Sequence, residues 1–314
     1  MTPTVCIFEQ LTAGSMTPSR CHVLGIGGLL LGLVVTLGAT LLPDKQHIGH
    51  FSAAEADSNG HPTEWMPISF GDVDAKTDYR LVERPVRGDT TTVVRAVSDG
   101  GAAGLGQEMR LDPRQYPILT WQWTVSTVLE RGHAREKDGD DYPARIYVTF
   151  DYDPSNFGFF DRAKYEALQV LGYDQVPTRA LNYIWASRVE KGTVLENPFT
   201  DWVQMVAVES GSTKVGTWVR EKRNIRADYR RAFGEEPPPI NGIAIMTDTD
   251  NTGESATAYY GDIVARPSPS VRNDGLDRSD LVNGPGPKGP GDLRFRERPY
   301  VTFIVPCIVA QWPG

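Results

Sequence analysis

Cysteine is scarce in this sequence. Of 314 residues only Cys6, Cys21 and Cys307 carry a thiol, which leaves residues 22–306 without one. A redox dithiol, a thiol protease or a zinc–thiolate site is therefore excluded from that span. An exported domain of about two hundred residues needs no disulfide, because its hydrophobic core is large enough without one.

Histidine is scarce too, with five residues in the chain. Only His133 lies inside the domain that we predict below, in the charge-rich segment "ERGHAREKDGDDY", where a solvated side chain is expected. A histidine-based triad and a three-histidine zinc site are thereby excluded from the domain, and no G-x-S-x-G motif is present. His47, His50 and His61 precede the domain, where a flexible linker is favoured over a metal site.

A concentration of positive charge is also missing. The chain has 32 Lys and Arg against 40 Asp and Glu, a formal net charge of -8, and no long Lys/Arg stripe. Binding to nucleic acid requires a positive surface that displaces counterions from phosphates, so no nucleic-acid partner is expected. An acidic surface is compatible with cations and neutral sugars.

An uncharged apolar run is present near the N-terminus. Residues 23–42, "VLGIGGLLLGLVVTLGATLL", follow a leader of residues 1–22 and have about the length that crosses a bilayer. This hydrophobic helix is predicted to be a signal peptide or a membrane anchor, because its small terminal residues permit cleavage whereas its length favours retention. The protein is thus predicted to be exported, either periplasmic or anchored in the inner membrane, with membrane contact through this segment if it is uncleaved.

The rest of the chain divides by composition. Residues 43–64 are predicted to be a polar stem, residues 65–265 a β-sandwich domain, and residues 266–314 a disordered Pro/Gly-rich tail. Within the domain, short apolar or alternating runs separated by turn residues predict strands at 68–74, 79–83, 91–97, 118–125, 144–152, 181–188, 202–209, 218–222, 242–247 and 256–264. Two helical segments, "FFDRAKYEALQVLGY" and "RADYRRAFG", are expected to cover sheet edges. The predicted fold is all-β, a jelly-roll-like sandwich.

Polar and aromatic residues on the predicted strands suggest a carbohydrate site. The period of two in "YPARIYVTFDY" puts Arg145 and Tyr147 on a polar face. A guanidinium and carboxylates would bind sugar hydroxyls while an aromatic ring stacks on the sugar. The candidate ligand-binding residues are Arg145, Tyr147, Asp141, Tyr183, Trp185, Asp250 and Asn251. The alternative, aromatics packed between two sheets, is the commoner arrangement and is weighted above the stacking platform.

The segment "DTDNTG" matches part of a calcium-loop pattern. Asp248, Asp250 and Gly253 fall at its first, third and sixth positions, but the closing Glu is missing. Asp248, Asp250 and Asp262 are the candidate ligands of a Ca²⁺ ion, and a turn in which Asp and Asn bond their own backbone is the alternative. A catalytic pair drawn from these acids, or from Asp140 and Asp141, is a further possibility.

The order of the segments "LTWQWTV", "DGDDYPARIYVTF", "LNYIWAS", "VREKRNIRADYRRAFG" and "GIAIMTDTDNTGESATAYYGDI" resembles the bacterial domain-of-unknown-function family 3047, over roughly residues 65–265. The resemblance implies an exported protein and carries no assigned activity. The "YYGDI" strand is also similar to the last strand of galactose-binding-like jelly rolls, an analogy of fold alone.

These observations favour an exported, non-catalytic domain that binds a carbohydrate. Two other functions stay open: a carbohydrate-active enzyme with paired carboxylates, and a structural or interaction protein of the cell envelope.

Overall fold

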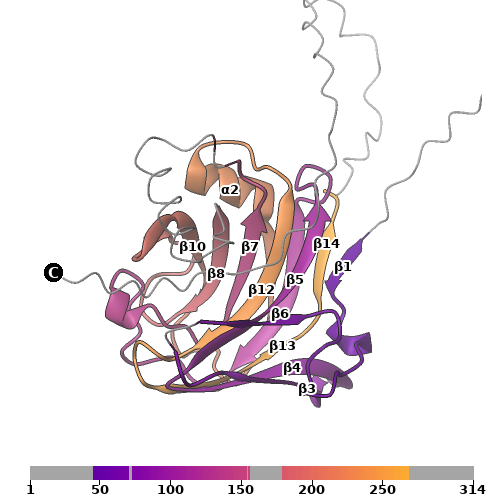
Figure 1. The fold of residues 1–314 in the computed structure, drawn as a ribbon, viewed down its shortest axis with the longest axis vertical. Helices are drawn as coiled ribbons and strands as arrows, with labels where there is room; N and C mark the ends of the chain where they lie inside the picture. The colour runs from indigo at the N-terminus through magenta and orange to yellow at the C-terminus, as the bar shows by residue number, and fades with distance from the viewer. Residues whose placement is uncertain (1–44, 71–72, 154, 156–178, 269–314) are drawn as a thin grey trace, which may run out of the picture. The chain divides into compact units, whose positions relative to one another are not determined.

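Two β-sheets packed face to face form the domain (Figure 1). The computed structural model describes residues 45–70, 73–153, 155 and 179–268. The predicted all-β, jelly-roll-like sandwich is confirmed. The predicted N-terminal helix, the first covering helix and nearly all of the tail lie outside the described residues. Within the described part, no helix is long and apolar enough to cross a membrane.

The first sheet has seven strands, paired antiparallel throughout. In spatial order they are β1 (Gln46–Gly49), β14 (Ile263–Arg266), β6 (Ile118–Val125), β13 (Ser255–Tyr260), β4 (Asp89–Asp99) and β3 (Asp78–Val86), with β11 (Val219–Asn224) also paired to β6.

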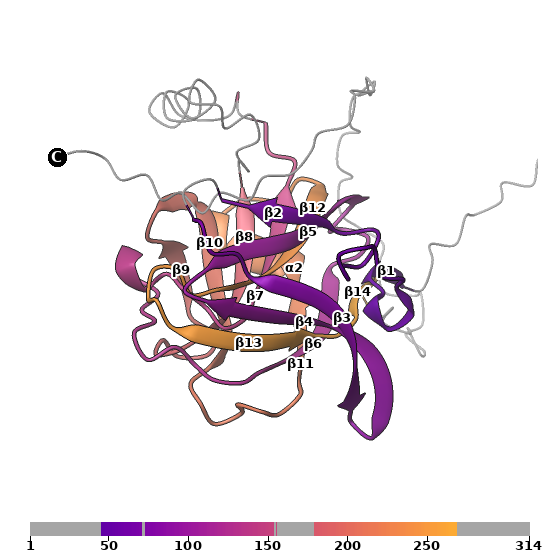
Figure 2. The same ribbon diagram turned by 60° about the horizontal axis from the view of Figure 1, so that its bottom comes forward.

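The second sheet also has seven strands, of which β8 and β10 pair in parallel. Their order is β2 (Met66–Ser69), β5 (Ala102–Leu111), β12 (Ile240–Asp248), β7 (Arg145–Phe150), β8 (Ala180–Ala186), β10 (Thr200–Ser210) and β9 (Val194–Asn197). The chain repeatedly changes sheet, for example from β4 to β5 and from β12 to β13 (Figure 2). Residues from distant parts of the sequence therefore meet at the sheet edges and in the end loops.

The core lies between the sheets and is rich in aromatic residues. On β7 the alternation predicted from the sequence is confirmed, since Ile146, Val148 and Phe150 all belong to the main core. The Trp121 and Trp123 rings meet edge to face with centroids 5.5 Å apart. Aromatic pairs of this kind contribute about 0.5–1.5 kcal/mol beyond their buried area.

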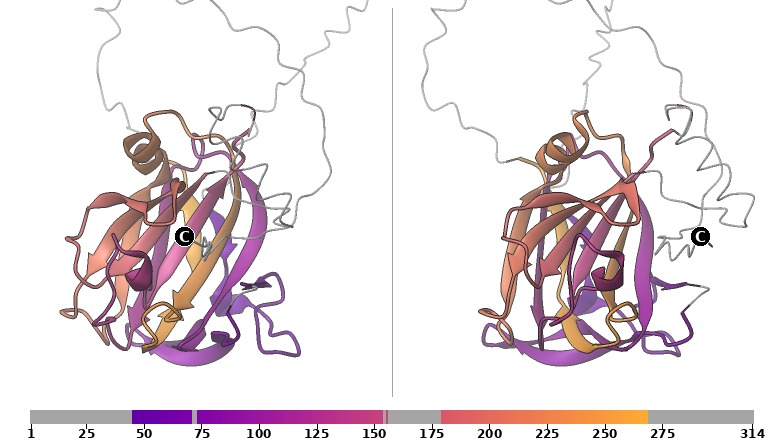
Figure 3. Two further views of the ribbon diagram at one scale, coloured as in Figure 1. Left: turned by 60° about the vertical axis from the view of Figure 1, so that its left-hand side comes forward. Right: turned by 90° about the vertical axis from the view of Figure 1, so that its left-hand side faces the viewer.

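One helix, α2 (Ile225–Phe233), lies at one end of the strands (Figures 1 and 3). Its N-terminus is capped by the Asn224 side chain, which accepts a hydrogen bond from the Ala227 amide, and it ends at Gly234 in the left-handed conformation. The Tyr229 ring packs on Phe150 with centroids 4.6 Å apart. The second predicted helix is thus confirmed.

The region predicted to be a polar stem differs in the structure. Residues 46–49 form β1, which pairs with β14, and the short 3₁₀ helix η1 (Phe51–Ala53) follows. Phe51 is fully buried and packs on Trp65 with ring centroids 5.0 Å apart. A strand of four residues contains only two repeats of the alternating pattern, which are too few to be recognised among polar neighbours. For the same reason β9 escaped prediction, while β5 escaped because its glycines, Gly104 and Gly106, disfavour a strand.

Candidate functional site

The predicted ligand-binding residues lie on opposite faces of the second sheet. Tyr183 and Trp185 belong to the main core and are fully buried between the sheets. Arg145 and Tyr147 point to the other face of the same sheet. The prediction that these aromatics form a stacking platform for sugar is therefore wrong, and the alternative of core packing is confirmed. Periodicity defines a face of a strand but does not reveal whether that face is exposed.

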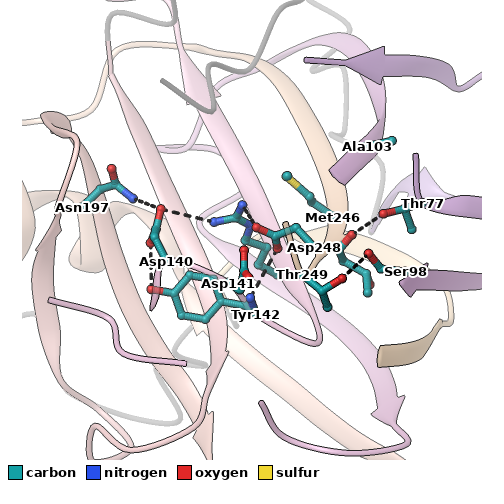
Figure 4. A network of polar contacts seen from close by, with 12 residues as sticks. Thr77, Ser98, Ala103, Asp140, Asp141, Tyr142, Asn197, Met246, Asp248 and Thr249 are labelled. Atoms are coloured by element: carbon teal, nitrogen blue, oxygen red, sulfur yellow. Dashed lines mark hydrogen bonds and ion pairs between the residues drawn. The ribbon is translucent and has the colours of Figure 1, made fainter. Parts of the chain in front are cut away.

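An acidic cluster surrounds Arg145, the first residue of β7. It combines Asp140 and Asp141, which precede β7, with Asp248 at the end of β12 (Figure 4). Asp250, in the turn after β12, completes the cluster. Arg145 is fully buried, forms a close ion pair with Asp248, and has Nη1 3.8 Å from Asp140 Oδ2. The guanidinium thus links the two segments.

Hydrogen bonds fix the carboxylates of Asp140 and Asp141. Asp140 accepts hydrogen bonds from the Tyr142 hydroxyl at 3.0 Å and the Asn197 amide at 2.8 Å. Burial raises the pKa of Asp140 to about 6, although Arg145 opposes the shift. Asp141 Oδ2 accepts a hydrogen bond from the Thr252 amide at 2.6 Å.

The cluster has more negative than positive charge. Burial, together with Asp141, Asp250 and Asp140, raises the pKa of Asp248 well above its ordinary value, against the effect of Arg145. Oδ1 of Asp141 and Oδ1 of Asp250 are shielded from water and accept no hydrogen bond within the described part of the chain. One oxygen from each of Asp141, Asp248 and Asp250 lies within 4.8 Å of the other two. Carboxylate oxygens gathered in this way suit a hard cation such as Ca²⁺.

The calcium prediction needs one correction. Asp262 does not approach Asp248 and Asp250; it lies between β13 and β14 and accepts hydrogen bonds from Ser52 N and Oγ at 2.8 and 2.6 Å. Its place beside Asp248 and Asp250 is taken by Asp141. The sequence pattern predicts sugar binding for Asp141 instead, because two residues more than a hundred positions apart share no recognisable spacing.

The turn after β12 also has a structural role. Glu254 accepts hydrogen bonds from the Glu130 and Arg131 amides, both at 2.8 Å, and so fastens the neighbouring loop to the turn. Gly253 adopts the left-handed conformation that the turn requires, and Asn251 is half-buried beside it. Asp140, Asp141 and Asp248 are each at most 3% exposed, so their oxygens do not line an open surface.

An open cleft lies elsewhere, where the edge strand β1 faces β5 across the two sheets. It has a volume of about 310 Å³. The lining residues are Gln46, His47, Ile48, Gln107, Met109, Arg110, Leu111, Asp112, Gln115 and Tyr116. Sequence reasoning missed this site, because two of its walls come from strands that were not predicted and because glutamines form no motif.

Polar groups of the cleft are only partly satisfied by the protein. Gln46 donates a hydrogen bond to the Tyr116 hydroxyl at 3.3 Å, and Gln107 donates to Glu64 at 3.4 Å. Gln107 Oε1 is shielded and accepts no hydrogen bond from the residues that the structure describes. Arg110 is exposed and forms no ion pair with any described residue. The cleft therefore offers amide groups and a cation beside an apolar wall of Ile48, Met109 and Leu111.

Residues 63–264 match the family model described as "Protein of unknown function (DUF3047)". The chain belongs to this family. The resemblance found in the sequence to DUF3047 is thereby confirmed. No curated protein matches the chain.

Several solved structures are similar to this DUF3047 chain. The K1 cleaved adhesin domain of Lys-gingipain from Porphyromonas gingivalis is 12% identical, with 72% of this chain and 99% of that chain covered and a TM-score of 0.31. An exo-beta-agarase is 8% identical, with 71% and 25% covered and a TM-score of 0.32. TmCBM61, solved in complex with beta-1,4-galactotriose, is 13% identical, with 66% and 87% covered and a TM-score of 0.24. Likenesses this distant do not bear on ligand or activity.

Proposed function

We propose that the protein is an exported, non-catalytic carbohydrate-binding protein whose ligand occupies the cleft between β1 and β5. The observation that carries the proposal is the combination, in one open cleft, of amide side chains, the exposed cation of Arg110 and an apolar wall. Ligand sites typically join an apolar lining to a few polar groups that fix orientation.

The chemistry of the lining matches that of a sugar. Glutamine amides donate and accept hydrogen bonds at once, as a sugar hydroxyl does, and Gln46, Gln107 and Gln115 supply three of them. The apolar side chains suit the C–H faces of a sugar ring. A volume of about 310 Å³ is near the lower end of small-molecule sites, which suits a mono- or disaccharide.

The small number of carboxylates in the cleft favours binding without catalysis. Hydrolysis of a glycosidic bond uses two carboxyl groups about 5–9 Å apart. Among the residues that line the cleft, Asp112 is the one carboxylate, and Arg114 forms an ion pair with it at 3.0 Å. The acids around Arg145 are not among the residues that line the cleft, and Asp140, Asp141 and Asp248 are at most 3% exposed.

A glycan array of neutral and uronic-acid oligosaccharides, followed by calorimetry on the full-length protein, tests the proposal. A hydrogen bond between neutral groups contributes about 0.5–1.5 kcal/mol, so Gln115→Ala should weaken binding by roughly 2- to 12-fold. Arg110→Ala should weaken it at least as much, and more for acidic sugars. Arg220→Ala, an exposed change on β11, serves as the control.

No binding at millimolar glycan, or binding that both cleft variants leave unchanged, would contradict the proposal. The envelope structural protein would then be the better account.

A further inference from the structure

Two histidines and an aspartate meet on the surface beside the cleft. His47 lies on β1, His50 precedes η1, and Asp262 lies between β13 and β14. One ligating atom from each residue lies within 4.8 Å of the other two. Both histidines are exposed and Asp262 is half-buried, so the group is open to solvent.

The fold brings these residues together through two local features. In the antiparallel pair of β1 and β14, His47 stands opposite Val264, two residues from Asp262. Gly49 then allows a tight reversal, since an added Cβ would lie 2.9 Å from the Phe51 ring. The reversal places the His50 ring 4.2 Å from that of His47, centroid to centroid.

Each side chain is prepared for coordination. Ser52 donates its amide and hydroxyl protons to Asp262, which fixes the carboxylate as outer hydrogen bonds commonly do at metal sites. Within the described part of the chain, neither imidazole is engaged in a hydrogen bond.

We propose that His47, His50 and Asp262 form a surface site for a transition-metal ion, with Zn²⁺ as the best-suited ion. Two imidazoles and one carboxylate are a common zinc ligand set that leaves a fourth position for water or a ligand. Ca²⁺ does not fit, because it takes oxygen ligands. The inference is independent of the proposed function, although His47 also lines the cleft.

The geometry requires only a small adjustment. Zinc bonds of about 2.0–2.2 Å in a tetrahedron place ligand atoms about 3.3–3.5 Å apart. The present separations of up to 4.8 Å would have to shorten by at most about 1.5 Å, which rotation of exposed imidazoles permits. A bound ion would fasten β1 and the turn after it to the connection between β13 and β14.

The test uses the full-length protein with Cys6, Cys21 and Cys307 replaced by serine, because thiolates also bind zinc. Zinc affinity is measured by competition with a chromogenic chelator, and the ligand set is read from the visible absorption of bound Co²⁺. Removing even a supporting group costs metal sites about 10- to 100-fold in affinity, so His47→Gln, His50→Gln and Asp262→Asn should each weaken zinc binding at least about tenfold. His133→Gln, outside the site, is the matched control.

The expected result is one ion per chain in the parent protein and loss of Co²⁺ absorption in each site variant, with melting in EDTA like that of the parent. Both histidines are exposed, so their variants should fold. Zinc affinity that the three site variants leave unchanged, or that His133→Gln lowers equally, would overturn the inference. No sugar is needed for this readout, so it stands apart from the glycan test.

Discussion

Glu221 offers a test of how burial controls stability in this domain. It lies on β11 directly across from Trp121 of β6, so its carboxyl group faces the core side of the first sheet. Its Oε1 is buried without a hydrogen bond, and Lys191 Nζ lies 3.7 Å away. Burial raises the pKa of Glu221 from its ordinary value of 4.5 to about 7, while Lys191 opposes the shift and Glu209 adds to it.

The sign follows from proton binding. Between pH 4.5 and about 7 the folded protein holds the proton of Glu221 more tightly than the unfolded chain, so stability falls as pH rises through this window. One pKa unit corresponds to about 1.4 kcal/mol, which sets an upper bound of about 3 kcal/mol. The neighbouring Lys191 side chain is 50% exposed, so water comes close to the Glu221 carboxyl group and reduces the desolvation that raises its pKa, which lowers the expected loss to about 1–2 kcal/mol.

Glu221→Gln should therefore leave stability unchanged near pH 4 and raise it by about 1–2 kcal/mol at pH 8, an increase in Tm of roughly 2–8 °C for a domain of this size. Thermal melts of both proteins across pH 4–8 measure the difference. Glu209→Gln is the matched control with the opposite sign. Burial opposes ionisation of Glu209, but hydrogen bonds from Lys214 and Lys191 outweigh it and lower its pKa, so its loss should destabilise the fold at pH 8. Parallel pH curves for Glu221→Gln and wild type would refute the reasoning.

Two further predictions concern the acidic cluster and the N-terminus. Extracellular calcium sites bind with Kd of roughly 0.1–1 mM, so 10 mM Ca²⁺ should stabilise the protein by about 1.4–2.7 kcal/mol over a chelated sample. Asp250→Asn should abolish this stabilisation and Asp262→Asn should preserve it. Melting curves that coincide with and without Ca²⁺ would contradict calcium binding at the cluster. Export predicts that an epitope-tagged protein fractionates with periplasm or inner membrane; full-length protein in the cytoplasm would contradict it, and a mass that begins after about Thr40 would select cleavage over anchoring.

Local regularities allowed much of the fold to be predicted. The two faces of β7 follow from the geometry of a strand, and the prediction of α2 followed from the segment "RADYRRAFG", which ends at Gly234. The solvent exposure of a strand face could not be predicted, because the alternating pattern around Trp185 is the same whether that face packs on the other sheet or meets water. The pairing of β1 with β14 was also beyond reach, because it joins segments more than two hundred residues apart.

The candidate sites depend on those distant pairings. Asp141 joins Asp248 only because β7 begins where its antiparallel neighbour β12 ends. Asp262 was predicted as a metal ligand from its residue type, together with Asp248 and Asp250. In the structure its neighbours are His47 and His50. Residue types thus indicated possible chemistry, and the sheet topology decided which of them act together.

The pairing of β1 with β14 has a mechanical consequence. Gln46, where the strand begins, stands opposite Ala265, near the end of β14, so the chain enters and leaves the sandwich side by side (Figure 1). Tension on the two ends pulls these strands apart at one end of their ladder, and their hydrogen bonds break in turn instead of sharing the load in shear. Under tension β1 is thus the element that separates from the sheet first. A cross-link between positions near Gly49 and Asp262 would stop this separation.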